Sequence, residues 1–291
     1  MSVETVASVL ASGIVLGSLY ALMAAGLSLI WSTLGIFNFS HGVFMTLGAY
    51  LAWQVGNEAG LGYGAAAGIA AAVTALAGLG CISERLLIRP FLGRENIVMI
   101  AVITTLAGLT FLENGALLIW GPRLKELKPL ATGTVSFAGA TMSAHQAIII
   151  VIAPLILVGL WLFLKRSRIG TAIRAVGQNR EAAILIGLSV ERLYMLAFAT
   201  SAILAAVAGI LLGAMRPMTP TMGAEPLVKA LVVAIFGGLG SIGGTIGGAY
   251  VIGLIEAAST YAIGLYWTPA VLFAVMIGVL LWRPNGLFGR G

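Results

Sequence analysis

One almost uncharged stretch near the N-terminus decides the fold class. Residues 5–57, between Glu4 and Glu58, read TVASVLASGIVLGSLYALMAAGLSLIWSTLGIFNFSHGVFMTLGAYLAWQVGN, and only His41 among them can carry a charge. About 20 apolar residues cross the hydrocarbon core of a bilayer, so this stretch has room for two spans. The polar, glycine-containing segment 31–42 (WSTLGIFNFSHG) separates them. We therefore predict a first span at about residues 6–30 and a second at about 43–55.

The composition of the whole chain agrees with this stretch. Of 291 residues, 60% are hydrophobic, 9% are charged and none is Asp, whereas soluble domains have about 45–50% apolar and about 25% charged residues. This composition excludes a soluble globular protein, so most of the outer surface faces lipid. The net charge of +6 is interpreted as membrane topology rather than as a nucleic-acid site, because basic residues mark the cytoplasmic side. The 39 glycines suit closely packed membrane helices.

Further apolar runs follow the first two spans. They lie at about 63–83, 97–120, 146–164, 193–215, 228–237, 245–263 and 267–282. We predict an all-α polytopic integral membrane bundle of eight or nine transmembrane helices, folded as a single domain over residues 1–291. The runs at 43–55 and 228–237 are too short to cross alone, which predicts broken or re-entrant segments near 32–42 and 228–244. Paired short spans of this kind are the best sequence pointer to a transport pathway.

The basic residues predict the orientation of the chain. The loop 165–192 carries six Lys or Arg against two Glu, and such loops stay in the cytoplasm. The loop 84–95 lies two crossings earlier and falls on the same side, while the N-terminus is predicted in the periplasm. Segment 121–145 disagrees, because it comes out external although its net charge is positive. The C-terminus is predicted cytoplasmic if 228–243 crosses the membrane, and external if that stretch dips in and returns.

The loop 165–192 is also the most informative segment for function. Its sequence predicts two short helices on the membrane surface, the second with Asn179 as N-cap, Glu181 in the first turn and Gly187 after its end. The apolar row AAILI at 182–186 would be costly to expose in so charged a loop. It therefore predicts a docking surface for a partner or for the lipid interface. The alternative is a solvated loop that serves orientation alone.

Polar residues and glycines at membrane depth are the candidates for a transport pathway. Irregular backbone at this depth must be buried in protein or line a cavity, and a charged side chain that faces lipid is costly. The candidates are Asn38, Ser40, His41, Glu113, Asn114, Gly237, Gly238, Gly240, Ser241 and Glu256.

Each group of candidates also has a purely structural interpretation. Asn38 or Ser40 would cap the second span, with His41 a hydrogen-bonded interfacial residue. Glu113 and Glu256 form either a polar wall near the external mouth or internally hydrogen-bonded packing groups. The glycines provide either a hinge or a contact between helices. A metal site or a nucleophile triad is not expected, because the chain has two histidines, one cysteine and no aspartate.

Four motifs, together with the apolar runs, carry a resemblance to a known family. They are GIFNFSHG at 35–42, the pattern AxRAxGxNxxAAxxxG at 172–187, FGGLGSIGGTIGG at 236–248 and RPNGLFG at 283–289. Over nearly its whole length the chain resembles the membrane permease subunits of branched-chain amino acid ABC importers, of the LivH type. Permeases for urea and short-chain amides resemble these closely, so the motifs specify the family better than the solute.

The resemblance implies a function and a set of partners. Such a permease lies in the bacterial inner membrane and moves branched-chain or other apolar amino acids inward. It works with a second homologous permease, two ABC ATPase subunits and a periplasmic substrate-binding protein. The family's coupling helix, which fits a groove on the ATPase, corresponds here to residues of the loop 165–192: Arg174, Gly177, Asn179, Glu181, Ala182, Ala183 and Gly187.

The chain is not expected to be an enzyme. A phosphate-binding loop needs a lysine directly after a glycine, and each of the four lysines here follows Leu or Val. ATP and magnesium are therefore expected on the partner subunits, with no cofactor in this chain. The alternative from a different class is a stand-alone channel or an ion-coupled carrier, which would need neither ATPase nor coupling loop.

Overall fold

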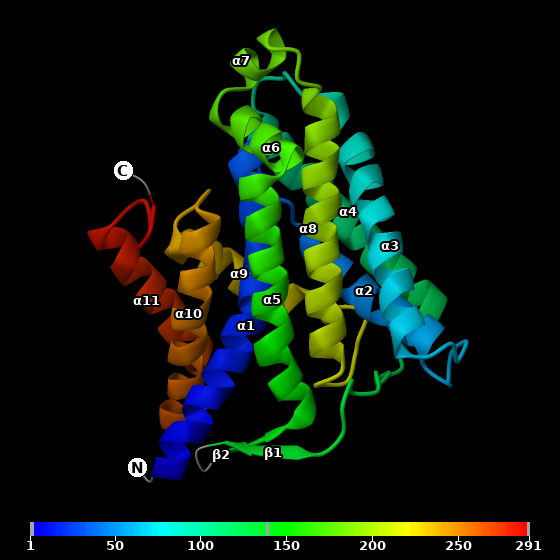
Figure 1. Ribbon diagram of the computed structural model, residues 1–291, viewed down its shortest axis with the longest axis vertical. Coiled ribbons are helices and arrows are strands. Elements are labelled where there is room, and N and C mark those ends of the chain that lie inside the picture. Colours follow the sequence, from blue (N-terminus) through cyan, green and yellow to red (C-terminus); the bar gives the residue numbers. More distant parts are fainter. Residues whose placement is uncertain (1–2, 138–139, 290–291) are drawn as a thin grey trace.

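The computed structural model describes residues 3–137 and 140–289, which form a bundle of helices running mainly along one axis (Figure 1). The helices and strands are α1 (Val3–Leu34), α2 (His41–Gly56), α3 (Ala65–Ser83), η1 (Glu84–Ile88), η2 (Arg89–Phe91), α4 (Ile97–Trp120), β1 (Thr134–Phe137), β2 (Ala140–Ser143), α5 (Ala144–Arg166), α6 (Arg168–Gln178), α7 (Arg180–Leu185), α8 (Val190–Gly213), α9 (Ala224–Gly237), α10 (Ile242–Ile263) and α11 (Thr268–Trp282).

Six of the described helices are long and apolar enough to cross a membrane: α1, α3 with its extension through η1 and η2, α4, α5, α8 and α10. Helices α2, α9 and α11 are apolar but shorter. The prediction of a polytopic helical membrane protein is thus confirmed as a class. The antiparallel hairpin of β1 and β2, which pairs Thr134 with Ser143, was not expected from the sequence.

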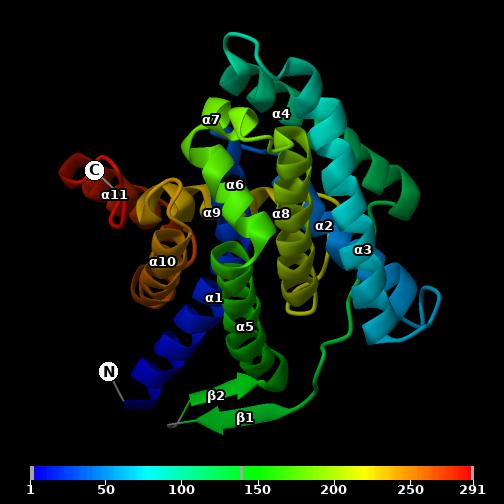
Figure 2. The same ribbon diagram turned by 45° about the horizontal axis from the view of Figure 1, so that its top comes forward.

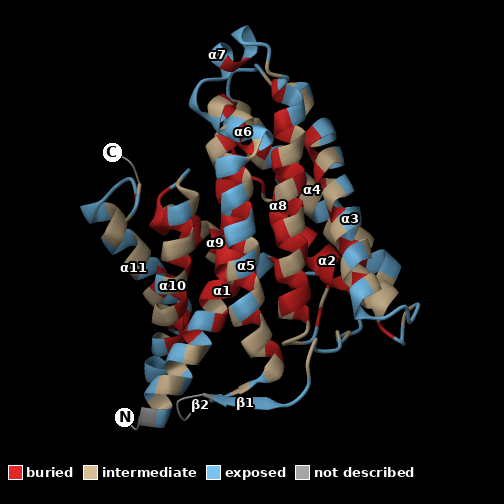
Figure 3. Ribbon diagram, in the orientation of Figure 1, coloured by how far each residue is buried: buried red, intermediate tan, exposed pale blue. Residues whose placement is uncertain are grey.

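The core of the bundle surrounds α1, α2 and α8, which are buried along most of their length, whereas α3, α4 and α11 turn broad faces outward (Figure 3). Helix α1 packs tightly against α10 because small residues meet at the crossing. A Cβ atom added to Gly253 of α10 would overlap the backbone of Gly17 in α1. Close approach through glycine, predicted from the composition, is therefore a feature of the central helix pair.

Two short helices begin in the interior of the bundle, and their N-terminal ends meet there. Helix α2 starts at His41, beside Met23 of α1. Ahead of α9, the Gly223 amide donates to Thr46 Oγ1 of α2 at 3.1 Å, and a Cβ atom on Gly223 would overlap the Gly42 carbonyl. The backbones of the two segments are thus in direct contact. Discontinuous helices that meet inside a bundle are a common element of transporters.

The two predicted breaks fare differently. The first is confirmed, because α1 ends at Leu34 and α2 begins at His41. The second, predicted near 228–244, lies in part where expected. Irregular backbone occurs at 238–241, after α9, and also at 214–223, before it, whereas residues 228–237 belong to the continuous helix α9 (Ala224–Gly237). The apolar run was too short because a proline and charged residues occupy the first turns of α9, not because the helix is interrupted.

The bundle has two distinct ends. The start of α1 and the β hairpin lie at the lower end of Figure 1, and α6 and α7 lie at the upper end, as the tilted view in Figure 2 also shows. After α11, the Leu287 amide donates to the carbonyl of Phe236 at 2.9 Å. This contact places the last described residues beside the end of α9, at the upper end. Segment 214–237 therefore passes from the lower to the upper end, which agrees with the crossing alternative.

Candidate functional site

Helix α6 is anchored across the upper end of α1. It begins with Ser167, whose Oγ accepts a hydrogen bond from the Gly170 amide at 2.9 Å. Its buried face consists of Gly170, Ile173 and Val176. At its last turn, a Cβ atom on Gly177 would overlap the Ser32 carbonyl of α1. Glycine at 177 therefore allows the backbones of α6 and α1 to approach closely.

Helix α7 follows with the local signals that the sequence predicted. Asn179 caps it by accepting a hydrogen bond from the Ala182 amide at 2.9 Å, and Glu181 lies in its first turn. Gly187 follows its end with a left-handed φ of +84°, a conformation that favours glycine. The N-cap, the position of Glu181 and the left-handed glycine are thus confirmed. The first of the two predicted helices is α6, over Arg168–Gln178.

The apolar row of this segment points mainly outward. Ile184, Leu185 and Ile186 are 52%, 87% and 74% exposed, whereas Ala183 is buried. Ala182 is also exposed. Three large apolar side chains therefore form a projecting tip at the top of Figure 1, which we call the α7 tip (Ile184, Leu185 and Ile186). Apolar surface of this kind on a basic loop marks a contact site.

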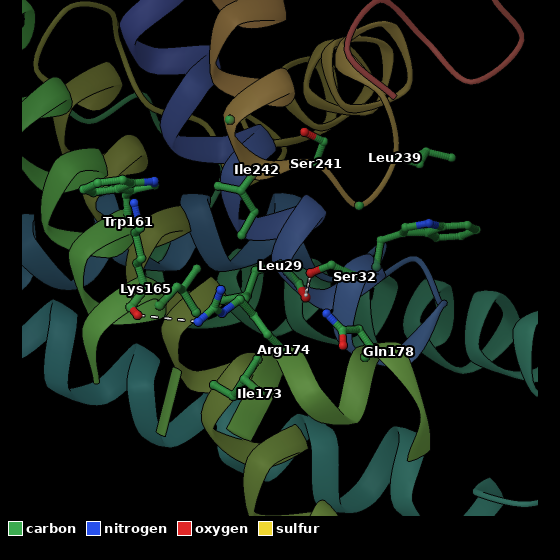
Figure 4. A pocket seen from close by; sticks show the side chains of 15 residues that line it. Leu29, Ser32, Trp161, Lys165, Ile173, Arg174, Gln178, Leu239, Ser241 and Ile242 are labelled. Atoms are coloured by element: carbon green, nitrogen blue, oxygen red, sulfur yellow. Dashed lines mark hydrogen bonds between the residues drawn. The ribbon is translucent and has the colours of Figure 1, made fainter. Parts of the chain in front are cut away.

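An upper cavity of about 700 Å³ lies under α6 (Figure 4). It is bordered by the upper ends of α1 and α5, by α6 and by the loop 239–243. Arg174 and Gly177 line it on one side, and Gly240 and Ser241 on the other. The guanidinium of Arg174 donates to the Lys165 carbonyl at 3.5 Å. The structure thus brings together two residues predicted for coupling and two predicted for the pathway.

Several other glycines of the 236–248 motif, among them Gly237 and Gly238, lie in close packing contacts. The Phe288 amide donates to the Gly237 carbonyl at 3.3 Å. Gly238 has a φ of +103° and lies against the backbone of Asn285 and Gly289. Ser241 caps α10, since its Oγ accepts a hydrogen bond from the Gly244 amide at 3.1 Å. The motifs at 236–248 and 283–289 are therefore parts of one contact.

Asn38, Ser40 and His41 belong to a closed group of polar side chains, which we call the neutral cluster; it also includes Thr105 and Ser201. All five are buried. His41 Nε2 lies 3.0 Å from the Met23 carbonyl, and His41 Nδ1 lies 3.1 Å from Ser201 Oγ. Ser40 Oγ donates to the Thr105 carbonyl at 2.7 Å.

The neutral cluster connects helices, and Asn38 also satisfies one backbone amide at the start of α2. Ser40 makes no side-chain cap at the start of α2, and the Asn38 side chain accepts from the Ser40 amide at 3.1 Å. Through these bonds α1, α2, α4 and α8 are held at one level. None of the three predicted residues lines the upper or the lower cavity. Their role in a pathway remains a prediction.

A lower cavity of about 860 Å³ lies toward the opposite end, between α1, α8, α9 and α10. A row of alternating charges borders it, which we call the ion chain: Arg216, Glu225, Lys229 and Glu256. Arg216 Nη1 lies 3.4 Å from Glu225 Oε2, Lys229 Nζ lies 2.8 Å from Glu225 Oε1, and the same Nζ lies 2.6 Å from Glu256 Oε1. The side chains of Arg216 and Glu225 are 39% and 59% exposed, whereas those of Lys229 and Glu256 are 16% and 4% exposed. The ion chain therefore runs from the surface into the bundle.

Sequence reasoning found Glu256 but missed its partner. Lys229 lies on a different helix, 27 positions away, inside the apolar run predicted at 228–237. The available signal was a lysine in an apolar segment, since such a residue pairs with an acid or faces water. Arg216 and Glu225 were also missed. They lie just before and at the start of α9, and the sequence does not show where this helix enters the bundle.

Glu113 and Asn114 lie apart from both cavities. They belong to α4, where Asn114 is exposed and Glu113 is half-buried. Asn114 Nδ2 donates to the Thr110 carbonyl of its own helix at 2.7 Å. Neither residue lines the upper or the lower cavity. Among residues 3–137 and 140–289, no group of three or more His, Cys, Asp or Glu side chains could hold a metal ion.

Comparisons with known proteins agree with this architecture. The family model described as "Branched-chain amino acid transport system / permease component" matches residues 9–280. The chain is 32% identical to the high-affinity branched-chain amino acid transport system permease protein BraD of Pseudomonas aeruginosa, over 97% of this chain and 95% of the relative. It is 33% identical to LivH of Escherichia coli K12, a protein of the same description, over 96% and 94%.

A more distant relative extends the similarity to an archaeon. The probable branched-chain amino acid transport permease protein LivH of Methanocaldococcus jannaschii is 28% identical over 97% of this chain and 92% of the relative. No solved structure matches the chain. The match over nearly the full length confirms the resemblance predicted from the sequence. In the bundle, the motifs at 172–187 and 236–248 lie around one cavity. The chain belongs to the family of permease components of branched-chain amino acid transport systems.

Proposed function

We propose that the chain is the transmembrane permease subunit of an ABC importer for branched-chain amino acids in the bacterial inner membrane. The observation that carries the proposal is the similarity over nearly the whole chain to permeases described as branched-chain amino acid transporters. In this assignment the chain hydrolyses no ATP. ATP and magnesium belong to two partner ATPases, a second homologous permease completes the membrane part, and a periplasmic binding protein delivers the solute.

The α7 tip is the proposed contact with an ATPase. Its three large side chains are exposed at the end of a basic segment, where burial by a partner would gain about 1.5–3 kcal/mol per side chain. Arg174, Asn179 and Glu181 shape the segment, and Gly177 joins it to α1. Motion of the ATPase would therefore reach α1 through α6, and α10 through the close packing of α1 on α10.

The proposed orientation places the upper end in the cytoplasm and the N-terminal end in the periplasm. The upper end carries the basic residues of η1, η2, α6 and α7, and the loops around them. Arg283, beside the end of α9, adds to this excess. Retention of Lys and Arg on the cytoplasmic side favours this orientation. We propose nine membrane segments for the described chain: the six long helices, α11 as a full span, and α2 and α9 as short helices inside the bundle.

The test of the proposed function is reconstitution of the assembled transporter. This chain, the second permease and the two ATPases are co-expressed, purified without crosslinker and placed in liposomes. The binding protein is then added. We expect leucine, isoleucine or valine, together with the binding protein, to stimulate ATP hydrolysis and leucine uptake. Uptake of leucine by this chain alone would contradict the proposal and support a stand-alone carrier. Stimulation by urea or an amide, and not by leucine, would reassign the solute.

The docking role of the α7 tip has its own variants. Leu185→Asp replaces the most exposed side chain of the tip by a charge, so we expect the ATPase subunits to be lost on purification. Leu61→Asp is the matched control, because Leu61 is also well exposed but lies in the loop at the other end of the bundle. Ala183→Asp is unsuitable, since Ala183 is buried and its replacement would disturb packing. Retention of the ATPases by Leu185→Asp would exclude docking at the tip.

A further inference from the structure

The lower cavity combines two kinds of lining. One wall is apolar and includes Leu16, Leu19 and Leu212, and the opposite part carries the ion chain. Two positive and two negative side chains make up the ion chain, so its formal charge is balanced. A conduit for apolar side chains alone would not need buried charges, which are expensive to keep in a membrane protein.

The ion chain has unused hydrogen-bonding capacity at its buried end. A lysine ammonium has three donors, and Lys229 contacts two carboxylates, Glu225 and Glu256, which leaves one donor. On the acceptor side, Glu256 Oε1 bonds Lys229, while Oε2 is buried and has no hydrogen-bond partner among the described residues. The Tyr20 hydroxyl is also a hydrogen-bonding neighbour of the Glu256 carboxylate. An unsatisfied buried acceptor is costly, so a ligand that donates to Oε2 would be stabilised there.

Lys229 and Glu256, which both line the lower cavity, therefore provide a spare donor and a buried spare acceptor next to its apolar wall. This pattern is complementary to a free amino acid, whose ammonium donates, whose carboxylate accepts and whose side chain is apolar. An amino acid that leaves water loses the hydration of both charges, at several kcal/mol for each ion. Groups that replace this hydration would lower the barrier to its passage.

We propose that the lower cavity is a transient binding site for the zwitterionic head group of the transported amino acid, an inference that rests on the proposed function. Glu256 Oε2 accepts from the α-ammonium group, and Lys229, with Arg216 at the mouth, donates to the α-carboxylate. The branched side chain lies against Leu16, Leu19 and Leu212. The site is weak, because a transport pathway must release what it binds.

A purely structural ion pair is the competing explanation, and it predicts different behaviour. Such a pair holds α9 to α10 and, once Glu225 beside Lys229 is neutralised, does not depend on which helix carries which charge. A head-group site depends on the position of each charge, because the ammonium and the carboxylate of the solute have a fixed order along the path. The two explanations therefore separate when the charges are exchanged.

The first test uses charge variants in the reconstituted transporter. Glu256→Gln keeps the shape of the side chain and removes its charge, and we expect leucine uptake to fall about tenfold, the loss of one charged hydrogen bond. ATP hydrolysis stimulated by the binding protein should persist. In a Glu225→Gln background, which avoids repulsion between residues 225 and 229, the exchange Lys229→Glu/Glu256→Lys should restore the thermal stability but not the uptake. Glu113→Gln, outside both cavities, is the control and should leave uptake unchanged.

The second test measures occupancy directly and does not depend on the ion pair. Thr260 lies one turn beyond Glu256 and lines the lower cavity. In a Cys81→Ser background, Thr260→Cys provides a single thiol in this chain, since Cys81 is its only cysteine. We expect millimolar leucine to slow the labelling of this thiol by a methanethiosulfonate reagent. 4-Methylpentanoate and 3-methylbutylamine, which each carry one of the two charges, should protect less.

The outcomes distinguish failure of the site from failure of the proposed function. Normal uptake in Glu256→Gln, full rescue of uptake by the charge exchange, or absence of protection by leucine would each overturn the head-group site. Equal protection by a singly charged analogue would overturn recognition of the zwitterion. None of these results would affect the proposed function, which fails only if the wild-type transporter shows no ATP hydrolysis or uptake that depends on branched-chain amino acids.

Discussion

The neutral cluster around His41 and the ion chain around Lys229 both place polar side chains inside an apolar bundle, but only the ion chain borders a cavity. In the neutral cluster, His41 is bonded at both ring nitrogens and the bonds tie four helices together, although Asn38 Nδ2 is buried without a partner among the described residues. In the ion chain, Glu256 Oε2 remains without a partner among the described residues, and the other end of the row reaches the surface.

This difference teaches how to separate polar groups that stabilise a membrane bundle from those that face a solute. The neutral cluster is the denser of the two in sequence, with Asn38, Ser40 and His41 within four positions, and this density predicted a pathway. The ion chain is dispersed over three segments. A high local density of polar residues marks a break in a helix, where backbone groups need hydrogen-bond partners. A pathway is indicated instead by polar side chains that border a cavity and lack a hydrogen-bond partner.

The largest expected effect comes from removing the cation of the ion chain. Lys229→Met leaves Glu256 charged, buried and unpaired, so we expect the free energy of unfolding to fall by about 3–5 kcal/mol. The unfolding midpoint of the purified transporter in detergent measures this loss. The double variant Lys229→Met/Glu256→Met should recover most of the stability, because an apolar pair of similar volume replaces a buried ion pair at little cost. Wild-type stability in the single variant would show that Glu256 is protonated or hydrated.

The neutral cluster should respond in stability and not in transport. His41→Leu leaves the Met23 carbonyl and the Ser201 hydroxyl without their partner, at a cost of about 1–3 kcal/mol. We expect a lower unfolding midpoint and unchanged leucine uptake per folded transporter. Ser201→Ala, which removes one of the two bonds, is the graded control. A tenfold loss of uptake at normal stability would instead assign the neutral cluster to the pathway.

Glu113 tests the comparison at a site that belongs to neither cluster. Because it is half-buried on α4 and borders neither cavity, Glu113→Gln should change the free energy of unfolding by no more than about 0.5 kcal/mol. The unfolding midpoint of the purified transporter measures this change, and gel filtration and uptake show whether the complex remains assembled and active. If the second permease no longer co-purifies, the exposed face of α4 is a subunit interface.

The smallest effect is expected for an ion pair in water. Lys128 Nζ lies 2.8 Å from Glu58 Oε1 in the loops at the lower end, and the ammonium holds the pKa of Glu58 below its usual range. The stabilisation is therefore present at neutral pH and is lost as the pH falls through the lowered pKa. Exposed pairs contribute little. The midpoints of wild type and Lys128→Met should differ slightly at pH 7 and converge at acidic pH. A difference that grows on acidification would contradict this sign.

The parts of the site that the sequence predicted are those set by neighbours in the chain. Asn179 caps a helix three residues away, and Gly187 ends it, so both are readable without a fold. The same holds for the break before His41, where polar residues and glycine interrupt an apolar run. Lys229 and Glu256 meet only because α9 and α10 pack side by side, and no local pattern records that contact. The hairpin of β1 and β2 was missed because its strands are short.

By itself, the sequence determined the membrane environment, the helical class, the family and the cap signals of the coupling segment. These follow from composition and from interactions within a few residues, which do not depend on how distant helices pack. Only the tertiary structure decided that α2 and α9 meet at Gly42 and Gly223, that Gly177 lies on Ser32, and that Lys229 pairs with Glu256 at a cavity. Such contacts depend on the relative rotation and depth of whole helices, which close packing fixes and a one-dimensional pattern does not.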